Sequence, residues 1–269
     1  MRALFIIFLA ACWFGSDGAR AQSKPSVSWS SFYLGGNLGA VTGASDFDAG
    51  VRPDTTYFNT GTDSAQTAAA GRGMLSQGRF TGGVVGGYTT RVGNILLGLE
   101  VSANAFDFND SRTGTDIFIS DPNVHFSFTQ TVKSDWIATL RPRLGWAQEN
   151  WLMYVTGGLA WTRVEFDFAY VDDNSQPGLG LPGASARGSA RTTKMGWTLG
   201  AGGEYALSRN WSLTGQYLFA DFGSIHAAAP LVPTPTLDEF SAVIGSSVHL
   251  RTNLILVGAT YRFGDAMLP

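Results

Sequence analysis

Three histidines and one glycine-rich segment are the residues whose types first suggest catalysis or ligand binding. His125, His226 and His249 fall in or beside different predicted loops, and no two of them have metal-ligand spacing. No serine shares a recognisable hydrolase motif with a histidine and an acid. Gly178-x-Gly180-x-x-Gly183 matches a dinucleotide-binding fingerprint, but no predicted strand precedes it and no helix follows it. The sequence therefore predicts no catalytic residue, no metal ligand and no cofactor.

A set of charged residues offers a different chemistry, because each member falls on a predicted inward-facing strand position. Arg141 and Arg143, for example, alternate with apolar neighbours and share a face with Thr139 and Gly145. Side chains fill the lumen of an eight-stranded barrel, so charges there must be paired and hydrogen-bonded. We predict a lumen charge network, in which the two arginines pair with Glu100 and Glu204 and close the barrel: Glu100, Asp135, Arg141, Arg143, Lys194, Glu204 and Arg262. The alternative is a narrow ion path with these charges as its filter.

Eight segments rich in aromatic and β-branched residues must position these charges. The predicted strands are 32–40, 79–90, 94–108, 132–147, 151–166, 192–207, 211–222 and 249–263. The gaps after the second, fourth and sixth strands are tight, whereas the others are long, covering 41–78, 109–131, 167–191 and 223–248. Strict alternation of short turns and long loops is typical of a transmembrane barrel with short periplasmic turns and long extracellular loops.

Composition supports an all-β membrane protein. Charged residues make up 14% of the chain, against about a quarter in soluble domains. No apolar stretch approaches the ~20 residues of a membrane helix, which leaves a closed antiparallel barrel as the structure that satisfies its backbone in lipid. Aromatic residues near the strand ends resemble the girdles at the two bilayer interfaces: Trp136, Trp146, Trp151, Tyr154, Trp161, Trp211, Tyr261 and Phe263. The net charge of −3 gives no indication of a nucleic-acid partner.

The N-terminal residues predict export. Arg2 precedes the short apolar run 3–11, and Ala19-Arg20-Ala21 has the small-x-small pattern of a cleavage site. We therefore predict a signal peptide over 1–21 and one barrel domain over 22–269. In the competing interpretation, Leu9-Ala10-Ala11-Cys12 is a lipobox and Cys12 carries a lipid. Cleavage after Ala21 would leave a mature chain without cysteine.

Short motifs in every predicted strand resemble the outer-membrane immunogenic proteins and opacity-type surface antigens, which are porin-family barrels of alphaproteobacterial type. The matching residues are Trp29-x-x-Phe32-Tyr33-x-Gly35-Gly36-Asn37-x-Gly39, Gly82-Gly83 with Gly86-Gly87-Tyr88, Gly98-x-Glu100, Arg141-x-Arg143-x-Gly145, Tyr154-x-x-Gly157-Gly158-x-Ala160, Gly196-Trp197-x-x-Gly200-x-Gly202-x-Glu204-Tyr205 and Gly258-x-x-Tyr261-Arg262-Phe263.

Two departures from this pattern affect what the resemblance implies. Family members usually end at the terminal aromatic residue, which the barrel-assembly machinery is thought to recognise, but here 264–269 follow Phe263. Members also often carry an acid where Gln216 stands, so one lumen ion pair is expected to be weaker.

The resemblance implies a structural and surface-antigen role in the outer membrane of a Gram-negative cell. Because no catalytic motif is present, we expect no enzymatic activity. The expected partners are outer-membrane lipids and lipopolysaccharide, the barrel-assembly machinery during insertion, and a host or surface ligand at the extracellular loops. A small porin for ions or solutes is the alternative function. An envelope enzyme that modifies lipids is the weakest of the three.

Overall fold

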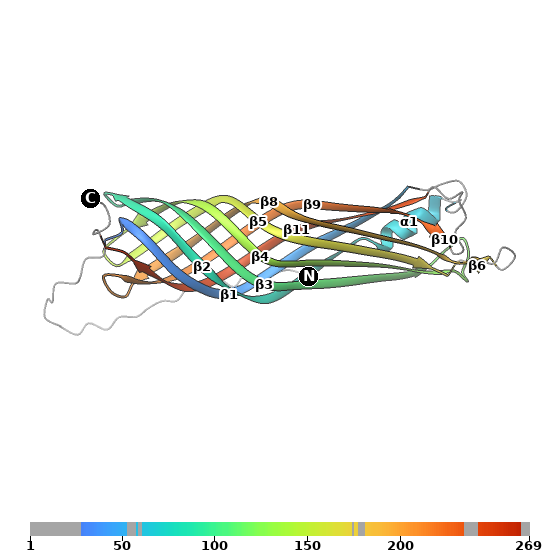
Figure 1. The fold of residues 1–269 in the computed structure, drawn as a ribbon, viewed down its shortest axis with the longest axis horizontal. Coiled ribbons are helices and arrows are strands. Elements are labelled where there is room, and N and C mark those ends of the chain that lie inside the picture. The colour runs from blue at the N-terminus through green and yellow to red at the C-terminus, as the bar shows by residue number, and fades with distance from the viewer. Residues whose placement is uncertain are drawn as a thin grey trace.

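The computed structural model describes residues 28–52, 58, 61–173, 175–176, 181–233 and 242–264. The predicted signal peptide, Cys12 and the first three residues of the segment from Gly178 to Gly183 lie outside these residues. Eight long strands dominate the fold (Figure 1): β1 (Ser31–Arg52), β2 (Gly73–Val92), β3 (Ile95–Ile117), β4 (His125–Ala147), β5 (Trp151–Asp172), β8 (Ala184–Ala206), β9 (Trp211–Pro230) and β11 (Val243–Arg262).

The strands form a closed antiparallel ring. Each long strand pairs with its neighbour in the chain, β11 returns to pair with β1, and β8–β9 pairing completes the circle. Short turns join the strands at one end, called the turn end, and longer connections lie at the other, called the loop end (Figure 1). The predicted eight-stranded up-and-down barrel is therefore confirmed. No helix within the described part of the chain is both long and apolar enough to cross a bilayer.

The strands are much longer than predicted. They contain 20 to 23 residues, so each measures about 70 Å along its length at ~3.3 Å per residue. A tilted transmembrane strand needs only about 9–11 residues. Most of the segments predicted as long loops are in fact the outer halves of strands. Their Gly, Ser, Thr and Asp residues resemble loop composition because they face water on strands that have left the lipid.

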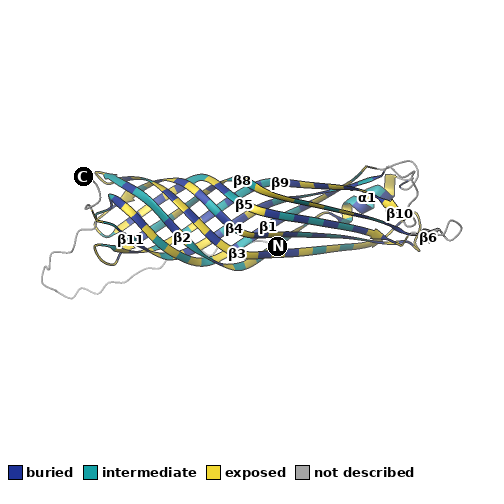
Figure 2. Cartoon of the chain, viewed as in Figure 1, coloured by how far each residue is buried: buried dark blue, intermediate teal, exposed yellow. Residues whose placement is uncertain are grey.

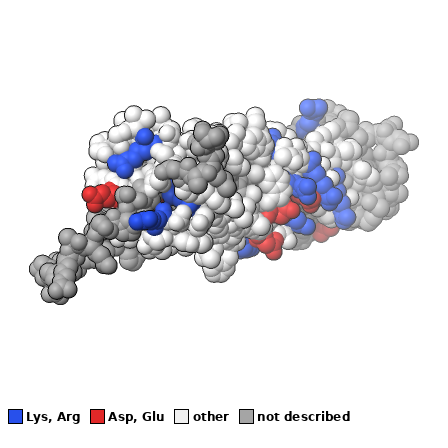
Figure 3. Space-filling model, turned by 60° about the vertical axis from the view of Figure 1, so that its left-hand side comes forward, with Lys and Arg blue, Asp and Glu red and all other residues white. Residues whose placement is uncertain are grey.

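The half of the barrel next to the turn end has a lipid-facing belt. Its exposed side chains are large and apolar, among them Leu38, Leu99, Leu144, Leu199 and Ile255. Figure 3 shows a broad uncharged band between the charged residues at the turn end and those farther along the wall. Because charged groups are costly in hydrocarbon, this band marks the segment that the bilayer surrounds.

The pattern inverts in the half next to the loop end. On β4 the outward residues there include Thr129 and Lys133, whereas the inward Phe128 and Val132 are fully buried. Figure 2 shows burial alternating along the strands in both halves. The interior of this half is an aromatic core, in which the rings of Phe128 and Phe168 stack 5.8 Å apart. The predicted polar lumen is therefore confined to the part of the barrel inside the lipid-facing belt. There the apolar side chains face lipid and the polar ones face inward. Beyond the belt the outer wall meets water, so the apolar side chains face inward instead.

The ring divides into two sheets near the loop end. Among the described residues, β2–β3 pairing stops at Thr81–Phe106 and β8–β9 pairing stops at Trp197–Asp221, while the other ladders continue. The strands β3–β4–β5–β8 therefore face β2–β1–β11–β9 across the aromatic core, as in a β-sandwich.

Small elements cross the two seams of this sandwich. Helix α1 (Gly61–Ala70) is tied to β3 by Arg112, which donates to the Ala70 carbonyl at 2.8 Å. Strand β10 (Val232–Pro233) pairs with the start of β8. The remaining short strands, β6 (Ser175–Gln176) and β7 (Leu181–Pro182), pair with each other.

Candidate functional site in the lumen

Five of the seven predicted lumen charges form one connected network beside the lipid-facing belt. Arg141 Nη2 lies 2.5 Å from Glu100 Oε1, and Arg143 Nη1 lies 2.9 Å from Glu100 Oε2. Arg143 also reaches Glu204 at 2.6 Å, and Glu204 accepts from Arg262 Nη2 at 2.5 Å. The members come from β3, β4, β8 and β11 and are 0–3% exposed. The network therefore joins buried side chains from four strands inside the part of the barrel that the belt surrounds.

Two tyrosines complete the network without having been predicted for it. Tyr33 donates to Glu100 at 2.6 Å and accepts from Arg143 at 2.7 Å. The Arg143 guanidinium lies 3.6 Å from the centre of the Tyr154 ring, a close cation–π contact. Both phenols fit only because glycine stands opposite: a Cβ at Gly87 would approach Tyr33 Oη to 2.7 Å, and one at Gly202 would approach Tyr154 Oη to 2.5 Å.

A tryptophan packs in the lumen between the charges and the turn end. Trp29 is 1% exposed and packs with Leu96, Leu152 and Tyr154 at the turn end. Its indole donates to the Gln148 carbonyl at 2.8 Å, and its ring lies 4.7 Å from the Arg262 guanidinium. The sequence showed Trp29 only as part of a family motif, because a single residue before the first strand carries no periodicity.

The structure corrects the placement of three predicted residues. Asp135 is exposed on the outer wall, since a bulge in β4 between Lys133 and Ile137 shifts the alternation by one residue. Lys194 is half-buried but lies away from the network, where its ammonium donates to the Ser224 carbonyl at 2.8 Å. Tyr154 is 5% exposed and faces the lumen, so it does not belong to the interfacial girdle.

The other predicted girdle residues lie on or near the outer surface. Trp146, Trp151 and Trp211 are 49, 38 and 50% exposed, and the remaining four are half-buried: Trp136, Trp161, Tyr261 and Phe263. The Trp211, Tyr261 and Phe263 rings form a row with centres 5.3 and 5.2 Å apart beside the turn end. Such amphipathic rings suit the headgroup level of a bilayer.

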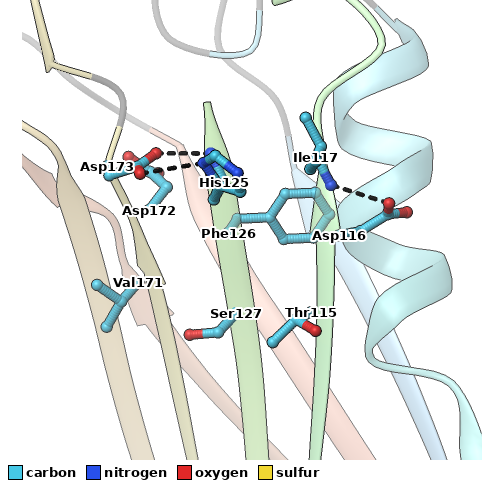
Figure 4. A pocket seen from close by; sticks show the side chains of 9 residues that line it. All are labelled: Thr115, Asp116, Ile117, His125, Phe126, Ser127, Val171, Asp172 and Asp173. Carbon is cyan, nitrogen blue, oxygen red and sulfur yellow. Dashed lines mark hydrogen bonds and ion pairs between the residues drawn. The ribbon is translucent and has the colours of Figure 1, made fainter. Parts of the chain in front are cut away.

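Two of the histidines make specific contacts. His125 lines a shallow pocket at the loop end (Figure 4), where Asp173 accepts from its backbone N–H at 2.6 Å and lies 3.3 Å from its imidazole. His249 lies between Ser224 Oγ at 3.2 Å and Asp221 Oδ1 at 2.9 Å. His226 is exposed on β9. Within the described ranges, no group of three or more His, Cys, Asp or Glu side chains is arranged to hold a metal.

The contact of His249 with Ser224 and Asp221 is an arrangement that sequence reasoning missed. Sequence spacing could not reveal it, because β9 and β11 bring the residues together beside an irregularity in their pairing. Arg251 lies 3.4 Å from Asp221 and 3.2 Å from Asp46. Asp221 therefore has a permanently charged cationic partner besides His249. The cluster therefore has the composition of an ion-pair network that joins β1, β9 and β11 just beyond the lipid-facing belt.

Comparison with known proteins agrees with this geometry. The model of the outer membrane protein β-barrel domain family matches residues 7–263. The chain is 31% identical over 251 residues to the 31 kDa outer-membrane immunogenic proteins of Brucella melitensis and Brucella suis, covering 90% of this chain and 87% of theirs. Solved structures similar to it include OprG of Pseudomonas aeruginosa, with 12% identity and a TM-score of 0.42 over 89% of this chain and 98% of that one. Another is the protease OmpT of Escherichia coli, with 10% identity and a TM-score of 0.42 over 90% of this chain and 99% of that one. On the match to the family model and the 31% identity to the two Brucella proteins, the chain belongs to the outer membrane protein β-barrel family and resides in the outer membrane.

Proposed function

We propose that the protein is a closed, structural outer-membrane barrel that holds a rigid β-sandwich above the cell surface as a surface antigen. The observation that supports this proposal is that buried side chains occupy the interior at three levels. Trp29 occupies the turn end, the buried ion pairs occupy the belt, and the aromatic core occupies the half beyond it. A solute path would have to cross all three layers.

The orientation follows from where the first and last long strands meet. The backbone N–H of Phe263 donates to the Phe32 carbonyl at 2.9 Å, so the first and last long strands meet at the turn end. Barrels of this type keep both termini and the short turns in the periplasm. The sandwich would then project outward among lipopolysaccharide, where its polar outer wall suits water and sugar. A host or surface ligand would meet the connections at its tip, and the barrel-assembly machinery would meet the turn end during insertion.

Conductance tests the closed lumen. We expect no steady conductance from the protein in planar bilayers if the ion pairs and the aromatic core close the lumen as proposed. An open porin inserted under the same conditions serves as the control for insertion and detection. Discrete, reproducible conductance steps from this protein would contradict the proposal and favour a small pore, with Arg141 and Arg143 as candidates for its filter.

Cysteine labelling tests the orientation. Ser120→Cys, exposed between β3 and β4, should react with a membrane-impermeant maleimide on intact cells. Asn94→Cys, exposed in the turn between β2 and β3, is the matched variant and should react only after the outer membrane is opened. Cys12 is the chain's single cysteine, so a mature chain cleaved after Ala21 has no competing thiol. Labelling of Asn94→Cys alone on intact cells would reverse the orientation.

A further inference from the structure

The lumen network contains more positive than negative charge. Its arginines are Arg141, Arg143 and Arg262, and its acids are Glu100 and Glu204, which gives a net charge of +1. Arginine keeps its proton in proteins, so the excess cannot be removed by deprotonation. An uncompensated charge in a medium of low dielectric constant is strongly destabilising.

The other buried acids of the described structure, Asp63, Asp110 and Asp172, lie in the half next to the loop end. Asp110, the next buried acid along β3, is ten residues from Glu100, or about 33 Å along the strand. Its Oδ1 already lies 3.3 Å from Arg79. Gln216 of β9 contributes an amide and not a carboxylate.

The arginine atoms of the network that lack a hydrogen-bonding partner in the protein are likewise donors and not acceptors. The Nε and Nη1 atoms of Arg141 receive no acceptor from the protein, although the residue is 0% exposed. Nε of Arg143, Nε of Arg262 and Nε2 of Gln216 are also buried donors without a protein acceptor. In the strand register Gln216 lies opposite Gly202, and Gly202 lies opposite Tyr154 on its other side. The Arg143 guanidinium stacks on the Tyr154 ring. This part of the lumen therefore has surplus donors and surplus positive charge together.

We propose that the lumen holds one small monovalent inorganic anion, such as chloride, at the free edge of Arg141. Water could accept the hydrogen bonds, but only an anion also cancels the charge. Close packing of the network restricts the ligand to a small ion. This anion site depends on the closed lumen of the proposed function, and the bound anion would help to close that lumen.

The test compares unfolding of the purified barrel in detergent in sodium chloride and in sodium gluconate at equal ionic strength. Gluconate serves as the comparison anion because it is much larger than chloride. Chloride at about ten times its dissociation constant should favour the folded state about tenfold, which raises the urea midpoint. Arg141→Met should lose this response because its lumen is neutral. Arg91→Met, which removes a surface arginine at the β2–β3 turn, should keep it.

A second variant covers the case in which Arg141→Met does not fold. Gln216→Glu retains all three arginines and adds the missing negative charge, so it should be more stable than the wild type in gluconate and insensitive to chloride. Equal wild-type midpoints in the two salts would overturn the anion site, as would an undiminished chloride response in Arg141→Met or Gln216→Glu. Conductance of the same samples separates the two proposals, because an anion-dependent barrel that conducts would refute closure and leave the site intact.

Discussion

Glu204→Gln should destabilise the barrel by about 3–5 kcal/mol, the range seen when one partner of a buried ion pair is removed. Glu204 is 3% exposed and accepts hydrogen bonds from both Arg143 and Arg262. The amide keeps the shape of the side chain but not its charge, so three arginines would face Glu100 alone. The free energy of unfolding in lipid vesicles, from urea titration, measures the loss.

Glu149→Gln is the matched control for this change. Glu149 is exposed in the turn between β4 and β5, so its neutralisation should change stability by less than about 0.5 kcal/mol. Adding Arg143→Met to Glu204→Gln should recover part of the loss, because it removes one of the orphaned charges. A Glu204→Gln barrel as stable as the Glu149→Gln barrel would show that the network does not contribute to stability.

Periodicity predicted the faces of the strands beside the lipid because the surroundings there differ sharply between inside and outside. Leu199 alternates with glycine and threonine, and Arg141 alternates with leucine and proline, so each face is visible in the sequence. The same alternation placed Glu100, Arg143, Glu204 and Arg262 inward, where the structure brings them together.

Local irregularities account for the error on the outer wall. Asp135 lies two residues before the inward Ile137, so strict alternation would place both side chains inside. The bulge in β4 between Lys133 and Ile137 places Asp135 outside instead. A bulge inserts one residue without a distinctive composition, so alternation alone cannot locate it. Contacts between distant strands, such as Tyr33 with Arg143, likewise depend on barrel closure and not on local spacing.

The strands of the sandwich beyond the membrane were predicted as loops for a different reason. Its outward residues are as polar as those of loops, and its inward phenylalanines stand singly between polar residues, as in the run from Phe126 to Val132. Alternation is present there with the opposite sense to that of the membrane half. A search for lipid-facing apolar residues stops at the bilayer surface and therefore predicts loops where the strands continue.

We expect the second large effect for Leu199→Arg, because the outer face of β8 passes from lipid to water along its length. Leu199 is 59% exposed in the lipid-facing belt, between the outward Gly157 and Phe219 of its neighbouring strands. An arginine on the lipid face near the bilayer midplane costs about 2–4 kcal/mol. We therefore expect Leu199→Arg to lower the free energy of unfolding in lipid vesicles by this amount.

Ser189→Arg tests the same face of β8 on the other side of the bilayer surface. Ser189 is exposed, points outward like Leu199 and pairs with Asp167, so a guanidinium there stays in water and finds an opposite charge. Its effect should remain within about 0.5 kcal/mol. Equal losses for the two variants would mean that both positions lie in the same medium, and the boundary drawn at the end of the uncharged band would be wrong. A large loss for Leu199→Arg alone would place the bilayer surface between residues 189 and 199 of this strand, with the sandwich standing clear of the lipid.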